Sequence, residues 1–276
     1  MKVERRAAFS SDGKGGNPAG VVLTNELPTA DQMQEVAAEV GYSETVFAAP
    51  QKGGFRVRYF APEAEVPFCG HATIALGAEL GKTNGAGKYA LTLNDTEITV
   101  EAFEEDGAWS ARLVSPNTSY RDVEPDLRAD ALALFGWTEA DIDPSLDMAR
   151  INGGAEHLLI PLATHEALKG MKYDFDKGAA LMQAHSLVTI NLVWRENANT
   201  IHSRNPFAGH GVYEDPATGA AAAALAGYMR DSAQVTEPFT VHQGVDMGVP
   251  SRLIVDPNPG KGQSVNVAGQ TRVINN

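Results

Sequence analysis

Apolar and polar residues alternate over short stretches through much of the chain, with the period of two that is typical of strands. Residues 89–103 contain two such stretches around a short turn, and residues 108–116 add a third. Residues 44–50 and 55–62 flank a pair of glycines, which predicts a hairpin. The N-terminal half is therefore predicted to be mostly β-sheet.

One segment of this half has a helical period instead. Thr29 and Gln32 have the spacing of a capping box, in which two side chains satisfy backbone N–H groups at a helix start. Gly41 is a typical stop signal. The apolar residues between these signals fall on one helical face: Met33, Val36, Ala37 and Val40. The pattern predicts an amphipathic helix.

Two other segments, residues 68–80 and 214–229, each join one reactive or ionisable residue to small polar residues and then to an apolar helical run. Both runs lack a polar face, and a helix that is apolar on every side must be buried. Small side chains would let surrounding strands approach closely. Each helix start has free N–H groups and the positive end of a dipole, so two starts at one cleft would hold a carboxylate.

The second half repeats the order of the first. A glycine-rich turn leads into an apolar strand at 15–23 and again at 152–162. The matched features lie about 135–150 residues apart, which suggests duplication of one β-rich lobe. We predict lobes over 1–118 and 119–263, with a polar, proline-containing boundary near 116–126. The remaining elements predicted in the second half are helices at 163–169 and 176–184, and strands at 187–194, 199–204, 238–242, 251–255 and 264–274.

Charge and cysteine content narrow the function classes. The net charge of −13 disfavours nucleic acid and anionic membranes as partners, and an anionic substrate would need local hydrogen-bond donors. A single cysteine excludes an internal disulfide and suits a reducing cytosol. The N-terminus has no signal-peptide pattern, and no apolar stretch approaches the length of a membrane span. These features predict a cytoplasmic enzyme or binding protein.

Three titratable residues are candidates for acid–base chemistry. Glu44 is on a predicted strand, where partial burial would suit a group that both takes and returns a proton; a solvated edge glutamate is the alternative. His71 is at a helix start, where a neutral imidazole either exchanges hydrogen bonds with a ligand or is structural. Asp215 precedes Pro216 and is a natural N-cap, which is the alternative to a chemical role.

The neighbouring small residues have two interpretations each. Cys69 is either a thiolate activated by the helix dipole or a small buried residue. Thr73 and Thr218 either cap their helices or contact a ligand, and Asn17, before Pro18, most simply forms a side-chain turn.

Several common motifs are absent from the sequence. The histidines show no metal-ligand spacing, and a sequence with one cysteine does not favour a zinc site. The glycine-rich segment 12–20 matches neither a phosphate loop nor a dinucleotide fingerprint, and there is no G-x-S-x-G elbow. We therefore predict no metal and no flavin, nicotinamide or pyridoxal phosphate cofactor.

Together the motifs resemble the PhzF-like (phenazine-biosynthesis-like) isomerase family, which is related in fold to diaminopimelate epimerase. The matching stretches occur in the family's order and cover most of the chain in general layout: GNPAGVVL (16–23), SETVF (43–47), RYFAPEAEVPFCGHATIAL (58–76) and EDPATGAA (214–221).

The resemblance implies an α+β fold with two pseudo-symmetric lobes, each a barrel-like sheet around a central helix, and an active site between them. It implies that the last strand, within 264–276, returns to the first lobe. Family habit also suggests a homodimer.

The resemblance further implies catalytic roles. Glu44 would transfer the proton, assisted by His71 and Asp215. The substrate carboxylate would bind at backbone amides of the helix starts, with contacts from Asn17 and Thr73. The amides concerned are those of Gly70, His71, Thr218 and Gly219.

Two departures from the family pattern affect the second lobe. Ala220 and Ala221 stand where members commonly have serine and then histidine, and Pro206 interrupts the usual arginine–aromatic–aromatic stretch. Cys69 matches the first cysteine of epimerase relatives, but Asp215 stands in place of the second, so a two-thiol mechanism is excluded.

The sequence predicts a cofactor-independent isomerase that shifts a proton, and with it a double bond, on a small carboxylic acid. A racemase or epimerase of an amino or hydroxy acid is the first alternative, with Asp215 or Cys69 as a second acid. A non-catalytic protein that binds small molecules or serves as a scaffold is the other alternative.

Overall fold

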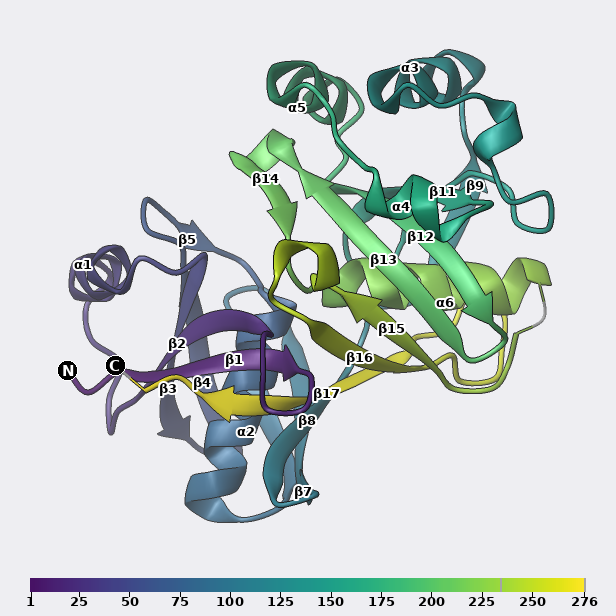
Figure 1. The fold of residues 1–276 in the computed structure, drawn as a ribbon. Helices are drawn as coiled ribbons and strands as arrows, with labels where there is room; N and C mark the ends of the chain where they lie inside the picture. Colours follow the sequence, from purple (N-terminus) through teal and green to yellow (C-terminus); the bar gives the residue numbers. More distant parts are fainter. Residues whose placement is uncertain (234, 276) are drawn as a thin grey trace. The chain divides into compact units, whose positions relative to one another are not determined.

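The computed structural model describes residues 1–233 and 235–275, which fall into two compact units (Figure 1). Unit 1 contains Met1–Val114 and the C-terminal segment from Ala268, and unit 2 contains Ser115–Val267. The chain leaves unit 1 once and returns at its end. No helix of the described residues is long and apolar enough to cross a membrane.

The strands of unit 1 form a closed ring in the order β1-β2-β3-β4-β6-β7-β8-β17 and back to β1. The short strand β5 pairs antiparallel with β4. The β2–β3 and β4–β6 pairs are parallel, whereas β1–β2, β1–β17, β3–β4, β6–β7 and β7–β8 are antiparallel. The bounds are β1 Glu4–Ser10, β2 Asn17–Leu23, β3 Glu44–Gln51, β4 Gly54–Phe60, β5 Glu65–Val66, β6 Gly87–Thr92, β7 Glu97–Glu105, β8 Ala108–Val114 and β17 Asn266–Val273.

The first helix, α1 (Ala30–Val40), begins and ends where the sequence predicts. The Thr29 hydroxyl accepts a hydrogen bond from the Gln32 amide, and the Gln32 side chain accepts one from the Thr29 amide. Gly41 ends the helix with φ of 68°. Met33 and Ala37 are buried, so the predicted face is the one that packs on the unit.

Helix α2 (Gly70–Asn84) is buried from His71 to Gly81 and packs against β1, β2, β3, β7 and β8. Two glycines let the strands approach its backbone. A Cβ atom at Gly77 would lie 2.6 Å from Val100 Cγ2, and one at Gly81 would lie 2.5 Å from the Trp109 ring. The prediction of a helix surrounded by sheet is confirmed for this unit.

A buried ion pair fixes α2 to the ring of strands. Arg6 on β1 donates from Nε to Glu79 Oε2 at 2.7 Å, and from Nη1 to Thr271 Oγ1 on β17 at 2.8 Å. Both charged residues are buried. An ion pair in this setting is strongly destabilising to break, because either partner alone would be a buried, uncompensated charge.

Unit 2 has a sheet in the order β9-β10-β11-β12-β13-β15-β16, with β14 paired to β13 as well. The strand bounds are β9 Ser119–Asp122, β10 Ala149–Asn152, β11 Glu156–Leu162, β12 Thr189–Asn197, β13 Thr200–Phe207, β14 Val212–Asp215, β15 Phe239–Gln243 and β16 Ser251–Asp256. The helices are α3 Pro125–Phe135, α4 His165–Lys169, α5 Phe175–Ala184 and α6 Gly219–Ala233, with 3₁₀ turns at Glu139–Asp141, Ala208–His210 and Val245–Met247.

Helix α6 is the counterpart of α2 and is buried from Ala221 to Arg230. It packs against β9, β10, β11 and β16. Close approach again depends on glycine, because a Cβ atom at Gly153 would lie 2.7 Å from the Ala224 amide nitrogen. The alanine-rich composition of α6 therefore serves packing within its unit.

The segment 116–126, expected as a boundary between lobes, contains β9 and the start of α3. Pro125 occupies the first turn of α3, and Gly136 ends it in a left-handed conformation with φ of 71°. Both are ordinary helix start and stop signals. The sequence therefore contains the signals for α3, a helix that the sequence analysis does not predict.

Gly77→Ala is expected to destabilise the protein by about 1–3 kcal/mol, because the new methyl group overpacks the contact with Val100. Alanine is the better helix former, so propensity alone would predict the opposite sign. Chemical denaturation measures the change.

Gly70→Ala, in the same helix, is the matched control. No atom lies within 4 Å of a Cβ built there, so this variant should not lose stability. Equal stability losses in both variants would show that close packing does not set the requirement for glycine at position 77.

Candidate active site

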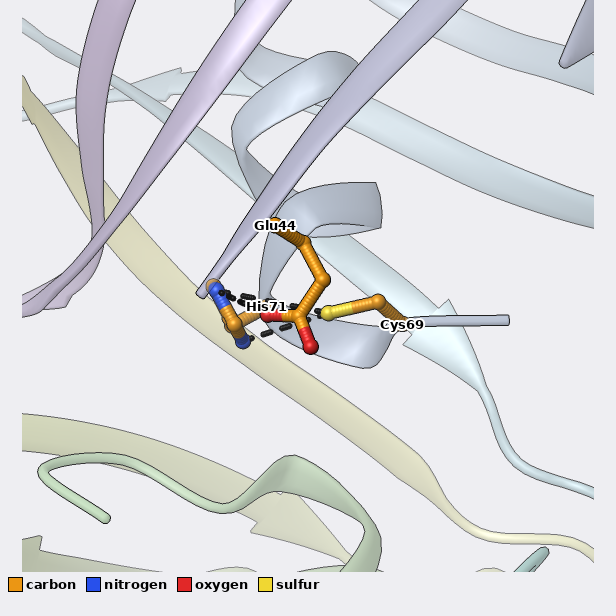
Figure 2. Close-up of side chains that lie close together, drawn as sticks. All are labelled: Glu44, Cys69 and His71. Carbon is orange, nitrogen blue, oxygen red and sulfur yellow. Dashed lines mark hydrogen bonds and ion pairs between the residues drawn. The ribbon is translucent and has the colours of Figure 1, made fainter. Parts of the chain in front are cut away.

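Three side chains of unit 1 that the sequence analysis singles out lie together at the start of α2: Glu44, Cys69 and His71 (Figure 2). Glu44 is the first residue of β3, Cys69 is the N-cap of α2, and His71 is in the first turn. Strand pairing and helix packing bring these positions together.

The His71 ring lies between the other two groups. Its Nδ1 atom is 3.3 Å from Cys69 Sγ, and its Nε2 atom is 3.4 Å from Glu44 Oε2. Ser43 Oγ is also 3.4 Å from Nε2. The tautomer with its proton on Nε2 fits these contacts. Its N–H group points to the Glu44 carboxylate, and its unprotonated Nδ1 can accept a hydrogen bond from the Cys69 thiol.

Glu44 is partly buried, with its side chain 21% exposed. Its Oε2 atom is fully buried and has no hydrogen bond, since the contact with His71 is within ion-pair distance but does not have hydrogen-bond geometry. A buried carboxylate oxygen normally has a partner. The atom is therefore an acceptor that a proton or a substrate group could satisfy.

The start of α2 has free hydrogen-bond donors. The Cys69 side chain makes no capping hydrogen bond, and the Thr73 amide donates to the Cys69 carbonyl at 3.0 Å, which is the spacing of the first helical turn. By helix geometry, the amides of Gly70, His71 and Ala72 have no partner within the helix. Space is open beside Gly70, so an anion could approach this positive end.

Thr73 is held by hydrogen bonds within unit 1. It is fully buried, and its hydroxyl donates to the Cys69 carbonyl at 2.7 Å. The Tyr59 hydroxyl, whose pKa is raised by burial, must then donate to Thr73 Oγ1 at 2.7 Å. These bonds support a role for Thr73 in shaping the helix start. Asn17 is buried at the beginning of β2, opposite Ala8 of β1.

In unit 2, Asp215 is the last residue of β14, and α6 begins at Gly219. The expectation that Asp215 and Pro216 open the helix is therefore wrong, because residues 216–218 form a loop between strand and helix. The Asp215 carboxylate instead accepts a hydrogen bond from the Thr218 hydroxyl at 2.5 Å.

Gln243, which the sequence analysis did not single out, holds this loop. The buried side chain accepts from the Thr218 amide at 3.1 Å and donates to the Asp215 carbonyl at 2.7 Å and to Thr218 Oγ1 at 3.0 Å. The Thr218 amide is thus already engaged and is not a free donor for a carboxylate. Gly219 is half-buried at the first position of α6.

A chain of hydrogen-bonded, buried polar side chains reaches β13, the strand that pairs with β14. His157 Nδ1 contacts Thr189 Oγ1 at 2.8 Å, and Thr189 donates to Asn205 Oδ1 at 2.9 Å. Asn205 is the register partner of Asp215. Asn205 Nδ2 donates to Ser203, Ser203 donates to Asn191, and Asn191 donates to the Ala221 carbonyl of α6. The chain links β11, β12 and β13 to the helix.

The chain is similar to known proteins over nearly its whole length. The model of the family described as phenazine biosynthesis-like protein, PhzC-PhzF, matches residues 6–276. An uncharacterised isomerase of Bacillus subtilis, YfhB, is 28% identical and is aligned over 99% of this chain and 98% of its own length. Trans-2,3-dihydro-3-hydroxyanthranilate isomerase of Pseudomonas fluorescens is 30% identical over 89% of this chain and 86% of its own.

The fold has a solved counterpart. The PhzF-family phenazine biosynthesis protein of Bacillus anthracis superposes with a TM-score of 0.87 at 21% identity, covering 100% of this chain and 98% of that one. The predicted α+β class and the predicted family resemblance are both confirmed.

Gln243→Leu should free the Thr218 amide and leave buried polar groups unpaired at the loop before α6. Loss of such partners costs about 1–3 kcal/mol each. Faster hydrogen exchange at the Thr218 amide, followed by NMR, is the expected result. The exposed Gln183 provides the control variant Gln183→Leu, which should leave that exchange rate unchanged.

Acid should destabilise the protein through His157. Burial lowers the pKa of this histidine from 6.5 to about 4. Between these values the unfolded chain binds a proton that the folded chain does not, so stability falls as pH decreases from 6.5 to 4. The loss attributable to this group is on the order of 3 kcal/mol. Denaturation of wild type and His157→Gln across this range should show a smaller pH slope in the variant; equal slopes would contradict the assignment.

Proposed function

The chain belongs to the PhzC-PhzF family of phenazine biosynthesis-like proteins, and we propose that it moves a proton on a small carboxylic acid without a bound cofactor. It is an isomerase, as its curated relatives are named. The observation that carries the proposal is the buried, unbonded oxygen of Glu44 beside His71.

Glu44 is proposed as the acid and base. Its buried Oε2 has no hydrogen bond to compete with a proton, while the partly exposed side chain gives a substrate access. A carboxylate that takes a proton from one carbon and returns it to another shifts a double bond within the same molecule. The reaction needs no second substrate and no electron acceptor, because the proton and the double bond both stay within one molecule.

His71 is proposed to assist. With a proton on Nε2 it would stabilise the ionised Glu44 carboxylate before the first transfer and again after the proton has been returned, and Cys69 and Ser43 would hold the ring in place. Cys69 has no assigned acid–base role in this mechanism.

The start of α2 is proposed to bind the substrate carboxylate. The amides of Gly70 and His71 belong to the first turn, and open space lies beside Gly70. Donors fixed in this way orient the carbon acid and stabilise charge as the proton leaves. They are also the kind of local donors that a protein of net charge −13 needs to bind an anion.

Asp215 and Gly219 of unit 2 are proposed, from the family resemblance, as further substrate-binding residues. Asp215 would bind an amino or hydroxyl substituent, and Gly219 would offer an amide at the start of α6. Thr218 would act by positioning Asp215, because its hydroxyl donates to that carboxylate and its amide is engaged by Gln243.

The name of one relative suggests a substrate class. The Pseudomonas fluorescens relative is named for a cyclic, unsaturated amino carboxylic acid. We propose a substrate of this class, a small ring acid with a double bond next to the carbon that loses its proton.

Glu44→Gln should abolish proton transfer, lowering turnover by about 10²–10⁴-fold, with an unchanged melting temperature. The amide retains the shape of the side chain but is not a base. Proton NMR in heavy water, on a panel of cyclohexadienyl, amino and hydroxy carboxylic acids, measures both label uptake and double-bond position. Glu63→Gln, an exposed glutamate of the same unit, is the matched control and should retain activity.

Other outcomes separate the alternatives. Inversion at one labelled carbon without double-bond migration would identify a racemase or epimerase. Binding of carboxylic acids with no label uptake would identify a binding protein or scaffold. Loss of stability in Glu44→Gln equal to its loss of activity would assign Glu44 a structural role.

A further inference from the structure

We propose that Glu44, Cys69 and His71 form a reversible site for a divalent transition-metal ion, Zn²⁺ above all, and that the bound ion inhibits the enzyme. The metal site stands on the geometry of the three side chains. The inhibition rests on the proposed function, because the ion would occupy the carboxylate that transfers the proton.

The donor set favours this class of ion. A thiolate, an imidazole and a carboxylate are the three protein ligands that Zn²⁺ uses, whereas Mg²⁺ and Ca²⁺ prefer oxygen alone. Among the residues that the structure describes, these three form the one cluster of at least three histidine, cysteine, aspartate or glutamate residues with ligand atoms close enough to share an ion. No spacing motif marks this cluster in the sequence, because Glu44 is 25 residues before Cys69 and only the folded chain brings them together.

The distances need little adjustment. One ligand atom from each residue lies within 4.8 Å of the others, and Cys69 Sγ is 3.3 Å from His71 Nδ1. Tetrahedral zinc with these ligands separates them by about 3.4–3.8 Å. His71 Nε2 is 3.4 Å from Glu44 Oε2 and 4.0 Å from Cys69 Sγ, so one ring nitrogen lies close to both other ligand atoms. The fourth position would be left to water or substrate.

The surroundings hold the ligands in place. Cys69 and His71 are buried at the N-cap and on the first turn of a helix that the ring of strands encloses, and Glu44 is at the start of a paired strand. Zn²⁺ binds cysteine as the thiolate, so Cys69 would release its proton when the ion binds. Two anionic ligands then balance the charge of the ion.

A second group of imidazoles does not converge in the same way. His202 lies beside His165 and His242 with ring centroids 4.8 and 5.4 Å apart, and its Nε2 atom is 2.8 Å from Glu196 Oε2. The rings lie alongside one another and Trp194 rather than pointing at a common centre. This group provides a control for the metal experiment.

Titration of the purified full chain with Co²⁺, the spectroscopic substitute for Zn²⁺, tests the site. The expected result is a near-ultraviolet thiolate-to-cobalt charge-transfer band at one ion per chain, which Zn²⁺ displaces. Cys69→Ser should abolish this band, and His71→Gln should weaken binding by more than about tenfold. His202→Gln should bind as wild type does. Melting temperatures of all variants establish that they are folded.

A second measurement needs no variant. Bound Zn²⁺ should protect Cys69, the single cysteine, from alkylation, and a chelator should restore the reaction rate. Absence of both the charge-transfer band and the protection would overturn the site, as would equal Co²⁺ affinity in Cys69→Ser.

The inhibition is tested separately by turnover with and without Zn²⁺. Reversal by the chelator is expected, and full activity of the zinc-loaded enzyme would overturn inhibition while leaving the metal site intact. The cobalt and alkylation measurements do not depend on turnover, so a failure of the proposed isomerase function is distinguishable from a failure of the metal site.

Discussion

The burial of one helix against strands is the constraint on which each unit depends. A buried helix has no face for polar side chains, so α2 and α6 consist largely of small apolar residues. Close approach then requires glycine where a methyl group would collide, as at Gly77 against Val100. The one acidic side chain in the buried part of α2, Glu79, is retained by a buried ion pair to Arg6, which also reaches Thr271.

The same packing creates the chemical features at the helix starts. A helix enclosed along its length has its first-turn amides and their dipole at a fixed place, and side chains beside that turn are fixed with them. In unit 1 this brings His71 and Cys69 to Glu44 of β3. In unit 2 the loop before α6 is held by Gln243, and a buried polar chain from His157 to Asn191 reaches the helix backbone. The two units reach a comparable arrangement through different contacts.

Local signals explain which features were predictable from the sequence. The capping box and glycine stop of α1, the hairpin of β3 and β4 and the buried apolar helices all depend on nearby residues, and the structure contains each of them. The start of α6 was mispredicted because an Asp-Pro pair opens many helices, whereas here Thr218 and Gln243 hold those residues as a loop. Gln243 and the His157 chain join strands far apart in sequence, so no short pattern marks them. The grouping of Glu44 with His71 was predictable only through family resemblance.

The closure of the unit 1 ring by β17 has a consequence for biosynthesis. The strand between β8 and β1 is β17 (Asn266–Val273), which follows nearly all of unit 2 (Ser115–Val267) in the sequence. During translation the N-terminal unit therefore waits as an incomplete sheet with two unpaired edges, while the C-terminal unit has all of its sequence first. N-terminal domains generally fold first during synthesis, but the sheet of unit 1 cannot close before most of unit 2 has been made. The open edges of β1 and β8 are the surfaces that a ribosome-bound chaperone would need to shield until β17 has been made.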